Sequence, residues 1–279
     1  MPMPHEGSRP IRPLSLHHLS ALDLSVDKLI AAAAAGGANH VCLFTQQPAD
    51  SGMVPVVIDD ARIQQVRQQL DDAGLSVLGI TSFPILRGVD PADYGPGLDR
   101  GAALGAICAN ARIGDLPLES AADKFARFGG LCAARGILPC IEFTGFGKVD
   151  ALAQALAIIS RAGCGALTLD PLHITRTGTL WEQIEALAPH LIGYVQICDG
   201  PLEASEDDYM AEAGRDRMLP GEGSFPLNRL LAIAPPAMPV SLEMPRQRLV
   251  KAGSNPFDVA RDLVVRSRAW LEANAGTEN

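Results

Sequence analysis

Short, almost continuously apolar runs alternate with helical stretches along the chain, and this alternation constrains the fold more than any other feature. Examples are "HVCLF" (residues 40–44), "ILPCIEF" (137–143) and "GALTLD" (165–170). Strands that are apolar on both faces are typical of parallel sheets covered by helices. About eight such units, with no GxGxxG fingerprint after the first strand, predict an α/β fold of the (β/α)8 TIM barrel type.

The length of the chain, 279 residues, suits one such barrel, because a TIM barrel of about 250 residues is a single domain. No linker, low-complexity tract or charge block divides the sequence. We therefore expect one domain over residues 1–279, of which about the first 10 residues form a flexible N-terminal extension.

The net charge of −9 predicts that neither nucleic acid nor an anionic membrane is a partner, because both require a basic face. The six cysteines are scattered without a CxxC pair, as is typical of small buried residues in a reducing compartment. No apolar run is long enough to span a bilayer, and the N-terminus carries no processing signal. We expect a cytoplasmic protein whose partner is a small molecule.

Polar side chains follow apolar residues near the ends of four predicted strands. They are Glu142 in "PCIEFTG", Asp170 in "LTLDPLH", Gln196 in "YVQICDG" and Glu243 in "VSLEMP". Taken singly, each acidic residue could cap the next helix, and the glutamine could be hydrogen-bonded in a core. Taken together, the strand ends of a barrel meet at one mouth, where three carboxylates would repel one another unless a cation lay between them.

A hard divalent cation takes carboxylate and amide oxygens as ligands. We therefore predict a metal site formed by Glu142, Asp170, Gln196 and Glu243, in which the amide oxygen of Gln196 is the neutral ligand. Mn²⁺ and Mg²⁺ suit such an oxygen-only set best, whereas Zn²⁺ usually takes histidine or cysteine. Co²⁺ and Zn²⁺ are the alternatives.

The chain from "CIEFTG" through "LDPLH", "VQICDGP" and "RDRMLPGEGSFPL" to "SLEMP" resembles the xylose isomerase-like TIM barrel superfamily of sugar phosphate isomerases and epimerases. The resemblance extends over nearly the whole chain and implies the same four metal ligands, on the fourth, fifth, sixth and eighth strands. The commonest family pattern has histidine in place of Gln196. In carrying glutamine at this position, the chain is similar to hydroxypyruvate isomerases and bacterial 3-dehydroshikimate dehydratases.

The resemblance also implies roles for residues around the metal. His173 belongs to a D-x-x-H motif, whose histidine faces the substrate; otherwise it would cap a helix or pack beneath a loop. Arg217 resembles the family arginine that binds a substrate hydroxyl, carboxylate or phosphate, and Arg215 is the alternative. Weaker candidates for the site are His17, His18 and Arg87, whereas Asp199 is expected to hold a turn.

The implied chemistry is proton removal next to a carbonyl, with Glu142 or Glu243 as base and His173 as an acid or base. The first hypothesis is a metal-dependent isomerase or epimerase acting on a small polyhydroxy carbonyl compound or keto acid; the second is a 3-dehydroshikimate dehydratase-like lyase. A DNA-repair endonuclease of the same fold would need more histidines and a basic face. The retained acidic residues argue against a binding barrel without catalysis. The resemblance also implies a homo-oligomer.

Overall fold

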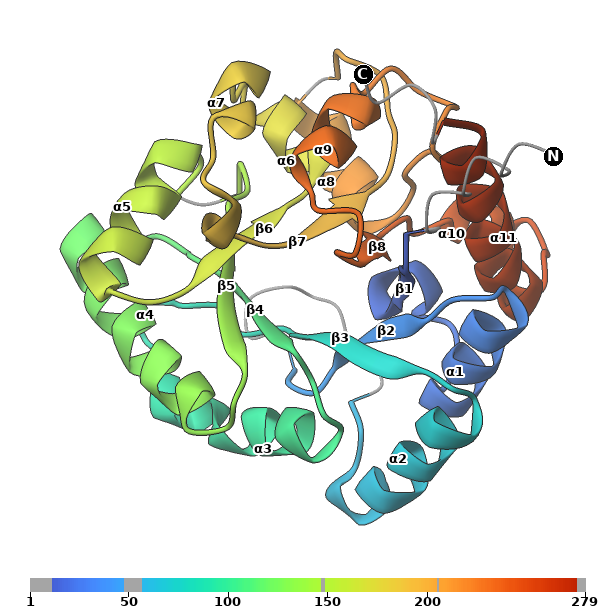
Figure 1. The fold of residues 1–279 in the computed structure, drawn as a ribbon, viewed down its shortest axis with the longest axis horizontal. Helices are drawn as coiled ribbons and strands as arrows, with labels where there is room; N and C mark the ends of the chain where they lie inside the picture. The colour runs from blue at the N-terminus through green and yellow to red at the C-terminus, as the bar shows by residue number, and fades with distance from the viewer. Residues whose placement is uncertain (1–11, 48–56, 147–148, 205, 275–279) are drawn as a thin grey trace, which may run out of the picture.

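The computed structural model describes residues 12–47, 57–146, 149–204 and 206–274; the expected N-terminal extension, residues 1–10, lies outside these ranges. Eight parallel strands close into a barrel in which each strand pairs with the next and the last pairs with the first. Figure 1 shows the strands at the centre and the helices around them. The predicted (β/α)8 barrel is confirmed. The strands are β1 (Leu14–His17), β2 (His40–Phe44), β3 (Ser76–Thr81), β4 (Cys108–Arg112), β5 (Leu138–Glu142), β6 (Ala166–Leu169), β7 (Ile192–Ile197) and β8 (Val240–Leu242).

The helices cover the outside of the barrel: those up to α9 lie in connections between successive strands, and α10 and α11 follow the last strand. They are α1 (Val26–Ala35), α2 (Ile63–Asp72), α3 (Gly95–Ala103), α4 (Leu118–Ala133), α5 (Leu152–Ala162), α6 (Pro171–Arg176), α7 (Trp181–Glu185), α8 (Glu206–Gly214), α9 (Leu227–Ile233), α10 (Gln247–Lys251) and α11 (Pro256–Asn274). Short 3₁₀ turns are η1 (His18–Ala21), η2 (Asp60–Arg62), η3 (Pro91–Tyr94) and η4 (Pro189–Leu191). None of the helices in the described ranges is long and apolar enough to cross a membrane.

Local sequence explains where individual helices begin and end. The side chain of Ser25 accepts the backbone N–H of Lys28 and caps the start of α1. Asp170 does the same for α6 through the N–H of Leu172, 2.8 Å away. α5 ends at Gly163, whose φ of +67° lies in the left-handed region that glycine adopts without strain.

Side chains alternate along the strands between two separate cores. The larger core lies between strands and helices and includes Val195 and Ile197 of β7. The smaller core fills the barrel interior and comprises Cys42, Leu78, Cys108, Cys140, Ala166 and Tyr194, which we call the inner layer. Gly79 leaves room for this layer, because a Cβ there would lie 3.3 Å from the Cys42 sulfur. The expected burial of the cysteines is confirmed for five of the six, and all six are free thiols.

The strand numbers implied by the family resemblance need one correction. The segment Cys108–Arg112, "CANAR", forms a full strand, β4, paired with both β3 and β5. Its inner face carries asparagine and arginine, so it lacks the continuous apolar pattern of the other strands. The four predicted ligands consequently lie at the ends of β5, β6, β7 and β8. The resemblance placed the first three on the fourth, fifth and sixth strands, so each of these numbers is one too low.

Candidate active site

The side chains predicted to bind a metal lie at the carboxyl end of the barrel. Glu142 and Gln196 come two residues after Cys140 and Tyr194 of the inner layer, so both face the interior. Asp170 and Glu243 follow β6 and β8 directly, and β7 places Gln196 between them. We call six residues the mouth cluster: Glu142, Asp170, His173, Gln196, Arg217 and Glu243.

Three members of this cluster come close enough to share a cation. Glu142, Asp170 and His173 each offer an atom within 4.8 Å of the others. Nε2 of His173 lies 3.9 Å from Glu142 Oε1 and 3.9 Å from Asp170 Oδ2. Burial lowers the pKa of His173 to about 4, so its imidazole is neutral at pH 7. The histidine of the D-x-x-H motif therefore reaches the predicted metal ligands.

Arg217 is the cation that the structure places among the carboxylates. Its Nη1 donates to Asp170 Oδ2 at 2.6 Å and lies 3.3 Å from Glu243 Oε2, and all three side chains are buried. Burial raises the pKa of Asp170, but the Arg217 guanidinium, together with His173 and the hydrogen bonds from Arg217 and Glu243, lowers it to about 2. Arg215, the alternative, is exposed.

Charge crowding affects the two glutamates in the opposite direction. Burial and the neighbouring Asp170 charge raise the pKa of Glu142 from 4.5 to about 7. Burial, together with the charges of Glu142 and Asp170, raises the pKa of Glu243 well above its usual value, even though Arg217 is near. Both glutamates keep raised pKa values even though Arg217 acts on them and Arg112 also acts on Glu142, so the cluster retains a preference for further positive charge.

Two members of the mouth cluster also have unused hydrogen-bonding capacity. Among the described residues, Glu142 Oε1 and both polar side-chain atoms of Gln196 are buried without a partner. A buried polar atom without a partner costs about 1–3 kcal/mol, so such atoms favour binding of water or a ligand. The alternative prediction, that Gln196 is hydrogen-bonded within a core, is therefore wrong. Carboxylate and amide oxygens with free lone pairs fit a hard divalent cation.

A second set of contacts holds the cluster from outside. Asn110 of β4 donates to Glu142 Oε2 at 3.0 Å and accepts the hydroxyl of Thr168 at 2.9 Å. His17 Nδ1 lies 3.2 Å from Glu243 Oε1, and burial lowers the pKa of His17 to about 3. Asn110 is not among the residues predicted from the sequence, because the segment "CANAR" lacks the apolar pattern of the other strands.

The remaining candidates have other places. The Nδ1 of His18 accepts the N–H of Phe44 at 3.3 Å. Arg87 is exposed in the loop after β3. Asp199 holds a turn as predicted, since its carboxylate accepts the N–H groups of Gly200, Gly221 and Phe225, each at 2.9 Å.

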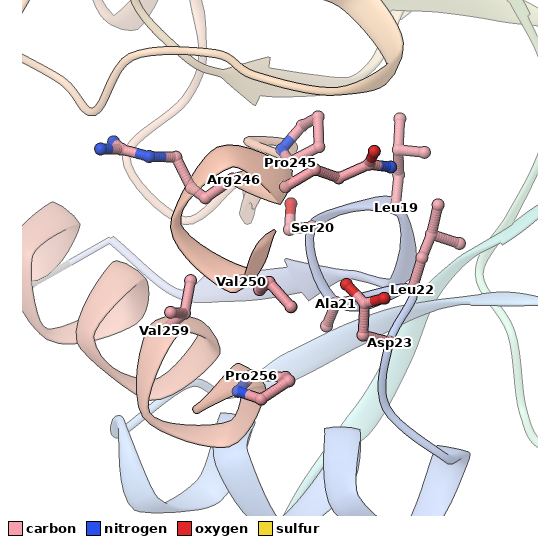
Figure 2. Close-up of a pocket in the computed structure, with 11 residues that line it drawn as sticks. Leu19, Ser20, Ala21, Leu22, Asp23, Pro245, Arg246, Val250, Pro256 and Val259 are labelled. Carbon is pink, nitrogen blue, oxygen red and sulfur yellow. The ribbon is translucent and has the colours of Figure 1, made fainter. Parts of the chain in front are cut away.

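A small pocket beside the mouth does not belong to the cluster. Figure 2 shows it between η1, the segment that begins at Pro245 and the start of α11. Its volume of about 10 Å³ accommodates one water molecule, so it is no substrate site. Beneath it the hydroxyl of Ser20 donates to Leu242 O and accepts the N–H of Met244, which fixes η1 to the end of β8.

Comparison with known protein families identifies the family of this chain. The profile of the xylose isomerase-like TIM barrel family matches residues 30–273. The chain belongs to this family. No curated protein matches the chain in sequence.

Three solved structures show how widely this fold is shared. The IolI protein with a zinc atom has 14% identity and a TM-score of 0.76, over 94% of this chain and 98% of its own. D-psicose 3-epimerase has 15% identity and a TM-score of 0.67, over 93% and 99%. The probable 3-DHS dehydratase AsbF from Bacillus anthracis has 16% identity and a TM-score of 0.67, over 90% and 97%. At these identities the likeness concerns the fold.

Proposed function

We propose that the protein is a divalent metal-dependent isomerase or epimerase that moves a proton next to the carbonyl of a small polyhydroxy compound. The observation that carries the proposal is the mouth cluster, in which three carboxylates and an amide converge and two of these side chains leave buried polar atoms without partners among the described residues. The epimerase among the proteins of similar fold supports it.

The residues that would hold the cation are Glu142, Asp170, Gln196 and Glu243, and their oxygen donors favour Mn²⁺ or Mg²⁺ over Co²⁺ or Zn²⁺. When bound, the cation supplies positive charge that favours loss of the proton next to the carbonyl. A rearrangement of the Arg217 contact to Asp170 Oδ2 would accompany its binding, because that oxygen already accepts a hydrogen bond.

The chain's own groups would then move the proton. Glu142 or Glu243 would remove it from carbon, and His173 would exchange a proton with a substrate oxygen. The guanidinium of Arg217 would bind a substrate hydroxyl or carboxylate. Return of the proton to the opposite face of the same carbon gives an epimer, and return to the neighbouring carbon gives an isomer.

A second function, dehydration of 3-dehydroshikimate, is favoured by Gln196 at the position where the family's dehydratases carry glutamine. The probable 3-DHS dehydratase of similar fold supports it as well. In this reaction the same base would remove the proton, and His173 would protonate the hydroxyl that leaves.

The test uses protein that has been treated with EDTA and reloaded with Mn²⁺, Mg²⁺, Co²⁺ or Zn²⁺. Each form is incubated in D₂O with a panel of keto sugars and keto acids, and deuterium in the substrate is measured by NMR. The same preparations are given 3-dehydroshikimate while protocatechuate absorbance is followed. Metal-dependent deuterium incorporation supports the isomerase or epimerase, and protocatechuate formation establishes the lyase instead. If neither occurs with any metal, both functions are wrong.

A further inference from the structure

The second ring nitrogen of His173 is held by a residue far away in the sequence. Nδ1 of His173 lies 2.7 Å from the hydroxyl of Tyr209, and both side chains are buried. Tyr209 lies on α8, in the long connection between β7 and β8. Figure 1 shows α6 and α8 together beside the last strands of the barrel. This contact links the D-x-x-H histidine to the segment that follows Gln196.

The hydroxyl of Tyr209 has a second partner, which fixes its direction. It accepts the backbone N–H of Gly145 at 3.0 Å, just after β5. A phenol can accept and donate at the same time, so an oxygen that accepts from Gly145 still has its one proton to donate. Among the described residues the other neighbour is His173, which favours the arrangement in which the tyrosine donates and Nδ1 accepts.

This direction of the hydrogen bond determines which ring nitrogen of His173 carries the proton. A neutral imidazole carries one N–H, so a ring whose Nδ1 accepts a hydrogen bond has its proton on Nε2. Nε2 is the atom that lies 3.9 Å from both Glu142 Oε1 and Asp170 Oδ2. An N–H at this point has no lone pair for a cation, although the side chain is near enough to be a ligand.

We propose that Tyr209 is a positioning residue that holds His173 as its Nε2–H tautomer, so that His173 donates a hydrogen bond to the substrate and does not bind the metal. The inference rests on the proposed function and deepens it, because it makes His173 a hydrogen-bond donor to the substrate. The cation is then left to Glu142, Asp170, Gln196 and Glu243.

Packing keeps the two rings in this arrangement. Phe146 stacks on Tyr209 with a centroid distance of 4.4 Å and an interplanar angle of 25°, and it meets the ring of His173 edge-on at 86°. Gly145 allows the close approach, since a Cβ there would come within 2.8 Å of the tyrosine ring. The hydroxyl is thus held by its ring as well as by its hydrogen bonds.

A parallel contact one helical turn further on fixes α8 independently of the tyrosine hydroxyl. Arg176, three residues after His173, forms a two-pronged ion pair with Glu212, three residues after Tyr209. The two N–O distances are 2.8 and 2.9 Å, and both side chains are largely buried. Removing only the hydroxyl of Tyr209 should therefore leave α8 in place.

The experiment reads the ring nitrogens directly by long-range ¹H–¹⁵N NMR on ¹⁵N-labelled protein, first with EDTA and then saturated with Mg²⁺. The His173 signals are assigned by their loss in His173→Gln. We expect a protonated Nε2 and an unprotonated, hydrogen-bonded Nδ1, and a shifted Nδ1 signal in Tyr209→Phe. Tyr94→Phe is the matched control, because Tyr94 donates its buried hydroxyl to Pro84 O, outside the mouth cluster.

A protonated Nδ1 in the wild-type protein would overturn the proposal, as would ring signals that Tyr209→Phe leaves unchanged. If turnover is found, Tyr209→Phe should lower kcat about 10- to 100-fold with little change in KM, whereas Tyr94→Phe should not. The NMR signals need no substrate. Failure of every substrate would therefore count against the proposed function while the tautomer result stood.

Discussion

On β5 and β7 the inner layer and the mouth cluster lie two residues apart, yet they differ in almost every chemical respect. In the inner layer the Cys42 sulfur lies 3.4 Å from Ser15 Oγ and 3.5 Å from Ser241 Oγ, and burial raises the pKa of this thiol to about 11. The layer is neutral and its polar groups are matched. In the mouth cluster, Glu142 and Gln196 keep buried atoms without partners among the described residues.

The difference separates the residues that stabilise this barrel from the residues that could bind a ligand. One step of two residues along β5 leads from Cys140 to Glu142, and along β7 from Tyr194 to Gln196. The first residue of each pair fills space, and the second is held in an arrangement that is costly without a ligand. Substitutions in the two zones should consequently separate loss of stability from loss of function.

The largest effect is expected for Glu243→Gln, which should reduce any metal-dependent turnover by about 10³-fold or more. The thermal melt of the metal-free protein should hardly change, because burial already raises the pKa of Glu243 and the amide has the shape of the protonated acid. Glu222→Gln is the control, since Glu222 pairs with Arg246 and Arg266 at the surface. A large fall in the melt would make Glu243 a structural residue and break the contrast.

Glu142→Gln should stabilise the metal-free protein at neutral and higher pH. A carboxyl whose folded pKa is raised from 4.5 to about 7 stabilises the fold fully below pH 4.5 and loses that contribution as pH rises through 7. A rise from 4.5 to about 7 corresponds to about 3 kcal/mol. Glutamine stays neutral and still accepts from Asn110.

The measurement is urea unfolding of Glu142→Gln and wild type in EDTA between pH 4.5 and 8.5. The difference in unfolding free energy should grow with pH in favour of the variant. The buried histidines, whose lowered pKa values destabilise the fold below about pH 6.5, are common to both proteins and cancel. A difference that does not vary with pH would mean that Glu142 is not held in a charge-crowded position.

Cys140→Ala tests the other side of the comparison. Removal of a fully buried sulfur from the inner layer should lower the free energy of unfolding by about 1 kcal/mol. Metal content and turnover should match those of wild type, as measured by elemental analysis and by the exchange assay. Loss of bound metal at unchanged stability would show that the inner layer also shapes the mouth.

The smallest effect is expected for Gln196→His. Histidine is a competent metal ligand and the commonest residue at this position in the family pattern, so the variant should keep one metal per chain with an affinity within about tenfold of wild type. Isothermal titration with Mn²⁺ measures this, and Gln196→Leu, which has no donor atom, should bind more weakly. Equal affinities in all three proteins would remove Gln196 from the ligand set.

The sequence alone predicted the barrel and the residues at its mouth because both leave local patterns. Apolar runs at regular intervals identify most of the strands, and Glu142, Asp170, Gln196 and Glu243 each interrupt such a run at its end. β4 was not recognised as a strand because "CANAR" lacks that pattern.

Tyr209 could not be found in this way. It lies 36 residues from His173, within the acidic stretch "EDDYMAEAG" of α8, whose composition is that of an ordinary surface helix. Its contact with the histidine depends on how α8 packs on α6, two helices that the Arg176–Glu212 pair also joins. Such contacts between distant segments have no periodicity that a single sequence displays.

The closed barrel also determines which parts of the site can adapt. Each strand is paired on both sides, so the backbone amides beneath Glu142 and Gln196 belong to a hydrogen-bonded ladder without an edge. Amides of this kind exchange with solvent only through large-scale opening, whereas those of a short surface helix exchange through local fraying. A ligand at the mouth should therefore slow the amide exchange of α8. The strands that carry the ligand's partners should show little change, because their amides exchange slowly without it.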